Sequence, residues 1–399
     1  MSAVCILGWY GSPNIGDEAE LDAILSMLAA LPAPPSVTVF STNPARTLAE
    51  CGAYPGGLCA LPRNPLARAA LRALYRSRLL IFGGGGLIQD KTSIYNLPIF
   101  TAFGLLARLA GCRLQWWGVG VEPLVTAFGR AQARLLVRLV APGGVSVRDE
   151  ISLRLLAHAG VPRSVLRLSA DPAISLRGTG AAGAAVRGRV AFCVRDLPNN
   201  ASGRGAEYLL PVSVQRRLGG GGRAAHARRA AEFYRLMARA ADYLIEAYGV
   251  RVVFVAFWPG RDDEIAATVR GQMRHADRAV IYGGPPIPRA VRELLGEMEM
   301  VVAVRLHALI FAAAGGVPGV GFSYARKVRG FMAGVGQEDR VFDPVGVKWP
   351  ELRAALDDCW NTRAEMRPLL LERVAEMQAL TAEDAAWAAR LLSEGKAAL

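Results

Sequence analysis

The segment Val301–Phe331 has the sequence VVAVRLHALIFAAAGGVPGVGFSYARKVRGF, and it decides the fold. The apolar, β-branched run Met300–Val304 predicts a strand, and Ala308–Ala314 predicts a short buried helix. Two glycines end that helix, and Val317–Phe322 predicts the next strand. A strand, a helix and a second strand in this order indicate a parallel sheet of the α/β class.

Cationic and titratable side chains follow both of these predicted strands. Arg305 and His307 come directly after the first, while Tyr324, Arg326 and Lys327 fall in a predicted loop after the second. Ligands of open α/β sheets bind outside the carboxyl ends of the strands. This group therefore suits a substrate that carries phosphate and carboxylate, with His307 able to titrate near neutral pH. The alternative is that Arg305 and His307 only cap the helix.

The length and composition predict two domains without a membrane span. The chain has 399 residues, of which 52% are hydrophobic and 20% charged, and this is enough for two cores. The sequence contains no run of 18 apolar residues, and the N-terminus MSAVCILGWYGS does not read as a signal peptide. The six cysteines lack metal-binding spacing, so we expect reduced thiols in the cytoplasm and no metal site.

The net charge of +13 comes almost entirely from arginine. It is compatible with a solvated basic surface that reflects a GC-rich genome, with anionic substrates, or with peripheral contact to an anionic membrane that carries a lipid-linked substrate. A nucleic-acid partner is not expected, because no basic stretch is interleaved with exposed aromatic residues.

A glycine-rich turn links the first predicted strand, Ala3–Leu7, to a predicted helix over Asp17–Ala30. The turn GWYGSPNIG leaves backbone N–H groups at a helix start, which is an anion site, and we assign Asn14 and Gly16 to it. It matches neither a dinucleotide fingerprint nor a Walker loop. Asp17 and Glu18 are either ordinary partners of the helix dipole or acid/base groups beside a bound phosphate.

Further along the first half, the predicted strand Leu79–Phe82 leads into Gly83–Gly86 and then Asp90. Four glycines allow a ligand or another backbone to approach closely, which singles out Gly84 and Gly85. The predicted strand Val145–Val147 ends in Arg148, and Val190–Val194 ends in Arg195.

The alternation of strands and helices predicts two doubly wound, Rossmann-like domains. We expect them at residues 1–176 and 190–350, with a Gly/Ala-rich linker at 177–189 and helices at 351–399 that could cross back to the first domain.

Five motifs in order resemble the polysaccharide pyruvyl transferase family, closest to the branch that pyruvylates secondary cell-wall polysaccharide for S-layer anchoring. They are GWYGSPNIGDEAELDAIL, FGGGGLIQDKTS, VSVRDEIS, SADPA and VRLHALIFAAAGGVPGVGFSYARKVRGF. The family's Gly-Asp-Glu motif matches Gly16, Asp17 and Glu18. Its Val-Arg-Asp-Glu motif ends in Arg148, Asp149 and Glu150. Its Arg-Leu-His motif matches Arg305, Leu306 and His307. The family commonly has Tyr-Asp-Pro-Lys where this chain has Tyr324, Ala325, Arg326 and Lys327.

The resemblance implies two Rossmann-like domains that face a cleft, as in two-domain (GT-B-like) glycosyltransferases. It also implies phosphoenolpyruvate as donor, no cofactor, and a sugar of a lipid-linked polysaccharide at the inner membrane surface, often N-acetylmannosamine, as acceptor. Ketal formation needs an acid for C3 of the donor, a base for the sugar hydroxyls, and cations for carboxylate and phosphate. We predict His307 and Asp17 for proton transfer; Arg148, Arg305, Lys327, Asn14, Gly16, Gly84 and Gly85 for the donor; and Glu18, Asp90, Arg195, Tyr324 and Arg326 for the acceptor.

Two other classes of function remain open from the sequence. A nucleotide-sugar glycosyltransferase would share the architecture but would need a site for base and ribose. A non-catalytic polysaccharide-binding protein would not need the predicted Arg, His, Lys and Asp residues to meet in space. The sequence does not predict an oligomeric state.

Overall fold

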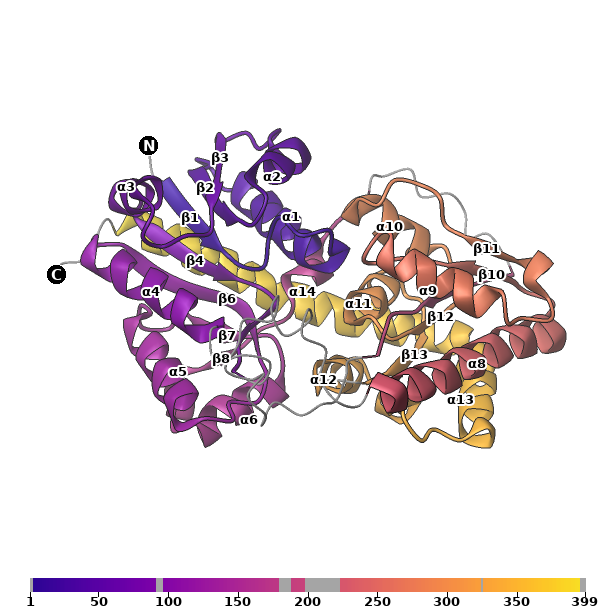
Figure 1. The fold of residues 1–399 in the computed structure, drawn as a ribbon. Coiled ribbons are helices and arrows are strands. Elements are labelled where there is room, and N and C mark those ends of the chain that lie inside the picture. Colours follow the sequence, from indigo (N-terminus) through magenta and orange to yellow (C-terminus); the bar gives the residue numbers. More distant parts are fainter. Residues whose placement is uncertain (1–2, 91–95, 179–187, 198–222, 324–325, 395–399) are drawn as a thin grey trace.

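The computed structural model of the chain describes residues 3–90, 96–178, 188–197, 223–323 and 326–394. They form two parallel β-sheets, one from each half of the chain, with helices packed on both (Figure 1). The predicted α/β class with two doubly wound domains is therefore confirmed. The domain bounds stay a prediction, and most of the predicted linker at 177–189 lies outside the described residues.

The first sheet has the strand order β3-β2-β1-β4-β6-β7-β8, and β5 pairs with β6. Every pair is parallel, and the strands are apolar because helices cover both faces. In β1, Val4 and Ile6 pack on one face while Cys5 and Leu7 pack on the other, as the two-residue period of a strand requires. The strands are β1 (Ala3–Leu7), β2 (Ser36–Ser41), β3 (Leu58–Pro62), β4 (Leu79–Gly83), β5 (Gly86–Ile88), β6 (Arg113–Val121), β7 (Val145–Val147) and β8 (Arg167–Leu168).

Two groups of helices cover this first sheet. Helices α3 (Arg68–Arg76), α4 (Asn96–Leu109), α5 (Ala127–Leu139) and α6 (Glu150–His158) contribute to the core on one face. Helices α1 (Ile15–Ala29) and α14 (Arg363–Ser393) contribute to the core on the other, and α2 (Pro44–Cys51) packs beside them. Short 3₁₀ turns, η1 (Arg163–Val165) and η2 (Pro172–Ser175), flank β8.

The second sheet has the order β11-β10-β9-β12-β13-β14 and is also parallel throughout. Its strands are β9 (Arg189–Cys193), β10 (Arg251–Phe254), β11 (Ala279–Ile281), β12 (Met300–Ala303), β13 (Gly319–Phe322) and β14 (Val341–Phe342). One face is covered by α8 (Arg223–Tyr248), α9 (Arg261–Arg270) and α13 (Trp349–Asn361). The other is covered by α10 (Pro288–Gly296), α11 (Leu306–Ala314) and α12 (Arg326–Gly334). The 3₁₀ turns η4 (Ala276–Arg278) and η5 (Glu338–Arg340) complete this half.

The C-terminal helix α14 contacts both halves of the molecule. Leu370 and Val374 in its first half pack into the core beneath α11, whereas Leu391 and Leu392 near its end pack into the core beneath α1. Figure 1 shows α14 in yellow, running behind both domains.

The deciding segment folds as strand, helix, strand and helix. Strand β12 and helix α11 match the expectation closely, with α11 beginning at Leu306 after Arg305 as its N-terminal flanking residue. The predicted loop after β13 is different: Arg326, Lys327 and Arg329 lie in the first turns of α12, and Tyr324 lies outside the described residues. Arginine and lysine are good helix formers, so a short turn after β13 is sufficient.

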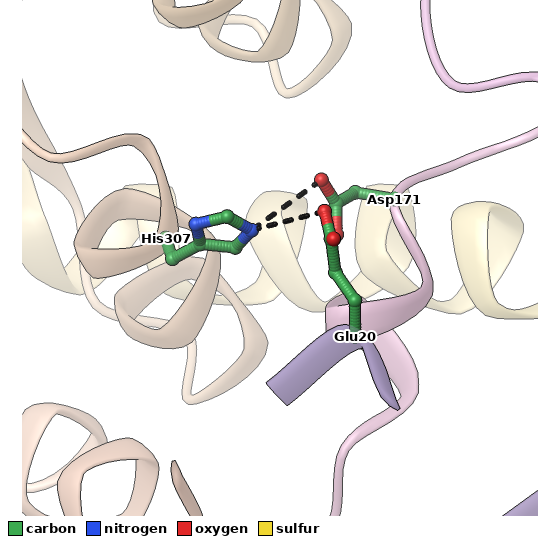
Figure 2. A group of neighbouring side chains, drawn as sticks. All are labelled: Glu20, Asp171 and His307. Atoms are coloured by element: carbon green, nitrogen blue, oxygen red, sulfur yellow. Dashed lines mark hydrogen bonds and ion pairs between the residues drawn. The ribbon is translucent and has the colours of Figure 1, made fainter. Parts of the chain in front are cut away.

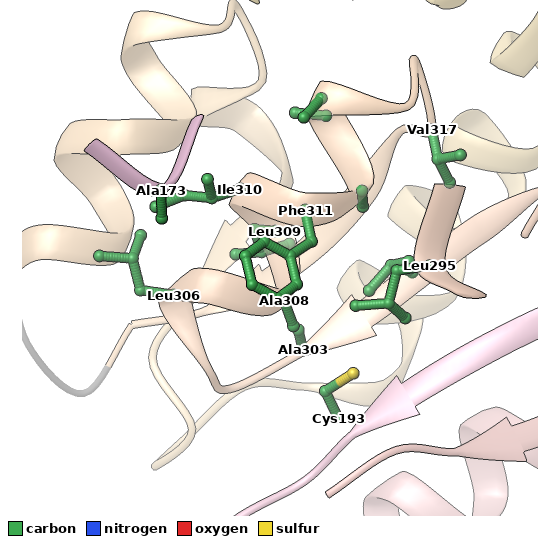
Figure 3. Close-up of a cluster of buried hydrophobic side chains, with 14 of the residues drawn as sticks. Ala173, Cys193, Leu295, Ala303, Leu306, Ala308, Leu309, Ile310, Phe311 and Val317 are labelled. Atoms are coloured by element: carbon green, nitrogen blue, oxygen red, sulfur yellow. The ribbon is translucent and has the colours of Figure 1, made fainter. Parts of the chain in front are cut away.

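The largest hydrophobic cluster joins the two halves (Figure 3). Helix α11 is buried along its whole length; on one side it meets the second sheet, and on another it meets Ala173 and Ile174 of η2. Ala19 and Ala23 of α1 belong to the same cluster. Because this core is shared, His307 in the first turn of α11 is held against the first domain.

The helices of the described residues include none that is long and apolar enough to span a bilayer.

Candidate active site

A cluster of polar side chains from both domains meets at the start of α11 (Figure 2). The Nε2 atom of His307 lies 3.3 Å from Oε1 of Glu20 in α1 and 3.7 Å from Oδ2 of Asp171, the residue that precedes η2. All three side chains are buried. The backbone N–H of Ile15 also donates to the carbonyl oxygen of Phe257 at 2.9 Å, which ties the start of α1 to the second domain.

Glycine at two positions makes this meeting possible. A Cβ atom on Gly16 would lie 2.0 Å from Nδ1 of His307, so only a glycine lets α1 approach the imidazole ring. Gly84 has a φ of +61°, and a Cβ atom there would lie 2.6 Å from the carboxyl carbon of Glu20. The next residue, Gly85, donates its backbone N–H to Oε1 of Glu20 at 2.7 Å. The run Gly83–Gly86 thus allows another group to approach its backbone closely, as expected from the sequence. That group is the carboxyl of Glu20.

Arg148 supplies a buried positive charge to the cluster. It follows β7, and its Nη1 atom lies 2.9 Å from Oδ2 of Asp171 and 3.7 Å from Oε1 of Glu20. Among the described residues, its Nε–H has no hydrogen-bond acceptor, although Oδ2 of Asp149 lies 3.6 Å away. A buried guanidinium with donor capacity left is suited to an anionic ligand.

The two carboxyl groups of the cluster differ in protonation. Burial raises the pKa of Glu20 well above its usual value, and the nearby charges of Asp171 and Asp17 raise it further. Burial alone would also raise the pKa of Asp171, but the positive charges of His307 and Arg148 outweigh it and hold that pKa below the usual value. When two carboxylates share one site, one of them keeps its proton. Glu20 therefore keeps its proton to a higher pH than Asp171 does.

His307 is neutral in this environment. Burial lowers the pKa of its imidazole, and the charges of Asp171 and Asp17 offset only part of that effect. Both carboxyls face the same ring nitrogen, Nε2, so a neutral imidazole can accept a proton there and release one from the opposite nitrogen, Nδ1.

Asp17 lies on the same side of α1 as Glu20, one helical turn earlier. Its Oδ2 accepts a hydrogen bond of 2.6 Å from Nδ2 of Asn14, the residue that caps α1. Burial raises the pKa of Asp17, while His307, Asn14 and Lys327 oppose that rise. The electrostatic influence of His307 and Lys327 places Asp17 at the shared site, as the sequence analysis proposed for a proton-transfer residue.

A cavity of about 510 Å³ reaches the cluster from the gap between α6, α12 and α14. Arg148 and Asp171 line its inner part, and Lys327 and Arg329 line it from α12. Arg154 and Arg373 also contribute, and the acidic residues Asp149, Glu150 and Glu376 line it as well, so the cavity is strongly charged with both signs. Arg148 and Lys327, which the sequence assigns to the donor, thus border one space.

Several predicted site residues have other partners. Arg305 forms a two-pronged ion pair with Asp262, at 2.9 and 2.6 Å, and Asp262 also accepts the backbone N–H groups of Phe257 and Trp258. This pair shapes the turn before α9 and neutralises Arg305, so we leave Arg305 out of the donor site. Asp90 is buried and accepts from the backbone of Val125 and Thr126 at the start of α5, which is a structural role.

The remaining acceptor candidates lie around the cleft without a shared centre. Oε1 of Glu18 accepts the N–H groups of Gly11 and Ser12 at 2.8 and 3.1 Å, which turns this carboxyl toward the glycine-rich loop. Burial raises the pKa of Glu18 to about 8. Arg195 follows β9 and donates to the carbonyl oxygen of Asp196, and Arg326 is exposed at the start of α12. Their part in acceptor binding stays a prediction.

Glu20, Asp171 and His307 could also be considered as metal ligands, because one atom of each lies within 4.8 Å of the others. Arg148 argues against this interpretation. Its guanidinium already pairs with both carboxyls, and a divalent cation would be repelled by it at this distance. We therefore treat the cluster as a hydrogen-bonded proton-transfer group, and the expected absence of a metal stays a prediction.

Glu20 and Asp171 are the residues that the sequence analysis missed. Asp17 and Glu20 are three residues apart, a spacing that places both on one side of a helix, and this signal pointed to Glu20. Asp171 lies in SADPA, one of the motifs that carry the family resemblance. Neither could be paired with His307 without knowing how the two domains face each other.

Two domains with parallel sheets, and a site between them at the carboxyl ends of the strands, define a GT-B-like fold. A family model described as polysaccharide pyruvyl transferase matches residues 14–326, and the chain belongs to that family.

Solved structures similar to the chain support the fold alone. The Anabaena protein HepE, solved with UDP and glucose, is 14% identical with a TM-score of 0.57, and the match covers 99% of this chain and 100% of that one. The Staphylococcus aureus protein MnaA, solved with UDP, is 10% identical with a TM-score of 0.57 and complete coverage of both chains. A glycosyltransferase from Rickettsia africae is 9% identical with a TM-score of 0.57, and the match covers 98% of each chain. No curated protein matches the sequence.

Proposed function

We propose that the protein transfers the pyruvyl group of phosphoenolpyruvate to a sugar of a cell-wall polysaccharide precursor, forms a pyruvate ketal and releases phosphate. Membership of the polysaccharide pyruvyl transferase family supports the class of reaction. The observation that carries the proposal is the meeting of His307, from the second domain, with the Glu20–Asp171 carboxyl pair and Arg148 from the first.

The donor carries a carboxylate and a phosphate, and the site offers cations for both. Arg148 borders the cavity with an unused Nε–H, and Lys327 borders it from the opposite domain. One cation from each domain would hold the donor across the cleft, so donor binding would also draw the two domains together.

The chemistry needs a proton at C3 of the donor. Once the C2–C3 double bond takes up that proton, C2 gains positive character and is attacked by a sugar hydroxyl. The C–O bond to phosphate then breaks, phosphate leaves with the bonding electrons, and a second hydroxyl closes the ketal ring. His307 transfers the proton in our proposal, and Glu20, whose pKa is raised by burial, resupplies it through the 3.3 Å contact.

The two sugar hydroxyls release a proton each. Asp17 is our candidate for the accepting base, because its pKa is raised by burial and it lies beside His307 at the same site. The ionised Asp171 would stabilise the imidazolium that forms when His307 is protonated, and Arg148 would keep Asp171 ionised.

The acceptor is proposed from the family resemblance. We propose N-acetylmannosamine of a lipid-linked precursor, presented at the inner membrane surface, as the sugar that is modified. The six cysteines are free and four of them are buried, which supports a place in the reducing cytoplasm.

A nucleotide-sugar glycosyltransferase is the second candidate, because similar folds have been solved with UDP. The two proposed functions predict different ligands that raise the melting temperature of the protein. A ligand that binds only the folded state raises the melting temperature. Phosphoenolpyruvate should therefore raise it more than UDP-sugars do, and the reverse ranking would favour the glycosyltransferase.

The direct test is phosphate release. The full chain is incubated with phosphoenolpyruvate and a series of synthetic lipid-linked disaccharides, and phosphate is measured with and without each acceptor. We expect acceptor-dependent release that the His307→Gln variant abolishes. Release of UDP from a nucleotide-sugar, with no phosphate from phosphoenolpyruvate, would replace the proposal with the second candidate.

A further inference from the structure

Helices α3, α4 and α5 form a surface with an unusual charge. Together they contain seven arginines and no aspartate or glutamate. They follow one another across the same face of the first sheet, α3 beside α4 and α4 beside α5 (Figure 1). Helix α1, on the opposite face of this sheet, has Asp17, Glu18, Glu20 and Asp22 and no basic residue. Helix α14 on that opposite face has both arginines and acidic residues, so the lack of acidic residues is what distinguishes α3, α4 and α5.

The same surface exposes large apolar side chains. Leu66, just before α3, is 77% exposed, Tyr75 is 71% exposed, Leu109 at the end of α4 is 72% exposed, and Phe128 in α5 is 63% exposed. Leu71, Leu105 and Val125 are also exposed on these elements. Single exposed apolar residues are ordinary, but seven of them, five on three adjacent helices and two just before α3 and α5, indicate an interaction surface.

The arginines and the apolar residues are interleaved. Arg68, Arg72 and Arg76 repeat every four residues and lie along one side of α3, and Leu71 and Tyr75 lie next to them with the same spacing. Arg138 is exposed on α5. Basic residues beside Leu, Tyr and Phe are typical of helices that lie in the interface of an anionic bilayer, where the apolar groups enter the acyl boundary and the cations meet phosphate headgroups.

A second copy of the chain fits this surface poorly. The interface of a two-fold dimer pairs a surface with itself. Here that would bring arginine-rich helices against arginine-rich helices, with no acidic residue in them to compensate.

We propose that α3, α4 and α5 dock the protein on an anionic membrane surface. Strand β6 ends at Val121, and the exposed Val125 and Phe128 follow it, so the docking surface extends to the sheet edge that carries Arg148. The active-site cleft would then open beside the bilayer. The position of the cleft beside the bilayer rests on the proposed function, because only a lipid-linked acceptor requires it. The docking of α3, α4 and α5 on a membrane does not rest on that function.

The test is flotation of the full chain with vesicles of phosphatidylcholine, with and without phosphatidylglycerol. We expect binding to the anionic vesicles that weakens as salt screens the charges. Each arginine near an anionic surface contributes about fivefold to binding. The triple variant Arg68→Gln, Arg72→Gln, Arg76→Gln should therefore bind at least about 100-fold more weakly.

Matched controls separate the surface from the net charge. Arg228→Gln, Arg235→Gln, Arg251→Gln removes three exposed charges from the second domain and should bind anionic vesicles like the wild type. Leu109→Ser with Phe128→Ser should also weaken vesicle binding, with an unchanged melting temperature to show that the fold is intact. Equal loss in both arginine triples would overturn the docking surface.

Two other outcomes would also overturn it. One is equal binding to neutral and anionic vesicles, or to neither. The other is a dimer in sedimentation that Leu109→Ser with Phe128→Ser dissociates, because the surface would then be a subunit interface. None of these measurements depends on catalysis, so a failure here leaves the pyruvyl transfer proposal intact, and the reverse is also true.

Discussion

Two of the buried carboxyl centres in the described part of the chain each include an arginine but differ in what else surrounds the acid. Asp384 of α14 is fully buried and accepts from the hydroxyls of Ser146 and Ser169 and from the guanidinium of Arg167. Around Glu20 and Asp171, in contrast, one acid faces another, and His307 comes from the other domain.

These different surroundings indicate that one centre stabilises the fold and that the other can transfer protons. Asp384 is surrounded by fixed donors of the first domain, so its carboxylate anchors α14 to β7 and β8. Glu20 and Asp171 have opposite pKa shifts, both lie beside Nε2 of His307, and Asp171 lines a cavity, so a proton can move between the carboxyl pair and His307. Burial of an acid alone does not identify a catalytic site; an acid that shares its site with another titratable group is the stronger indication.

The largest effect should come from His307→Gln. Glutamine keeps hydrogen bonding but cannot carry the proton, so turnover should fall by about 100-fold or more while donor affinity stays nearly unchanged. Turnover is measured by phosphate release and affinity by calorimetry. His275→Gln, at an exposed histidine that pairs with Glu246, is the control and should keep wild-type turnover. If His307→Gln keeps most of its turnover, proton transfer belongs to another residue, with Asp17 next.

Substitution of Arg148 should weaken donor binding, whereas substitution of Arg167 should weaken the stability of the fold. Arg148→Ala removes a charge-assisted contact with the donor, worth about 1.5–3 kcal/mol, so phosphoenolpyruvate should bind about 10- to 150-fold more weakly. Arg167→Ala, which removes the matching cation beside Asp384, should lower the melting temperature and leave donor affinity within about twofold. Normal donor binding by Arg148→Ala would place the anion site elsewhere.

Glu20→Gln tests the carboxyl pair itself. Glutamine can still accept the Gly85 N–H, but it cannot resupply His307 with a proton, so turnover should fall by about 10- to 100-fold. Donor affinity should change little, because Arg148 and Asp171 remain. A Glu20→Gln enzyme with wild-type turnover at all pH values would assign Glu20 to structure, like Asp384.

The smallest effect on turnover should come from Asp384→Asn, which acts on stability instead. Burial raises the pKa of Asp384 from 3.8 to about 6. An acid whose pKa is raised on folding stabilises the fold below its unfolded pKa, and that stability is lost as pH rises through the folded pKa. Between pH 4 and 6 the wild type should therefore lose about 2 kcal/mol that the variant does not lose. Urea unfolding of both proteins across this range measures the difference, and parallel curves would contradict it.

Much of the fold could be predicted from the sequence, because apolar runs and glycine turns are local signals. The strands Ala3–Leu7 and Val145–Val147 have the predicted bounds. The helix at Arg326 was predicted as a loop, since nothing local distinguishes a basic loop from the first turn of a basic helix.

The site was only partly predictable, because its pairings are distant in sequence. Arg148 and Lys327 border one cavity, and Arg148 and His307 both contact Asp171, whereas the role of Asp17 stays a prediction. The partner of Arg305 is Asp262, 43 residues away, and the partner of His307 is Glu20, 287 residues away. The first pair joins two distant segments of the second domain and the second pair depends on how the two domains meet, so no local residue pattern contains either.

The helix that carries Asp384 also limits how the two domains can separate. The chain passes between the sheets once after η2 and returns once through α14, a continuous helix of 31 residues. Bending that helix would break backbone hydrogen bonds, so α14 is a stiff connection between the two halves. Because η2, α1 and α11 also share one hydrophobic core, His307 stays against Glu20 as long as that core and α14 are intact.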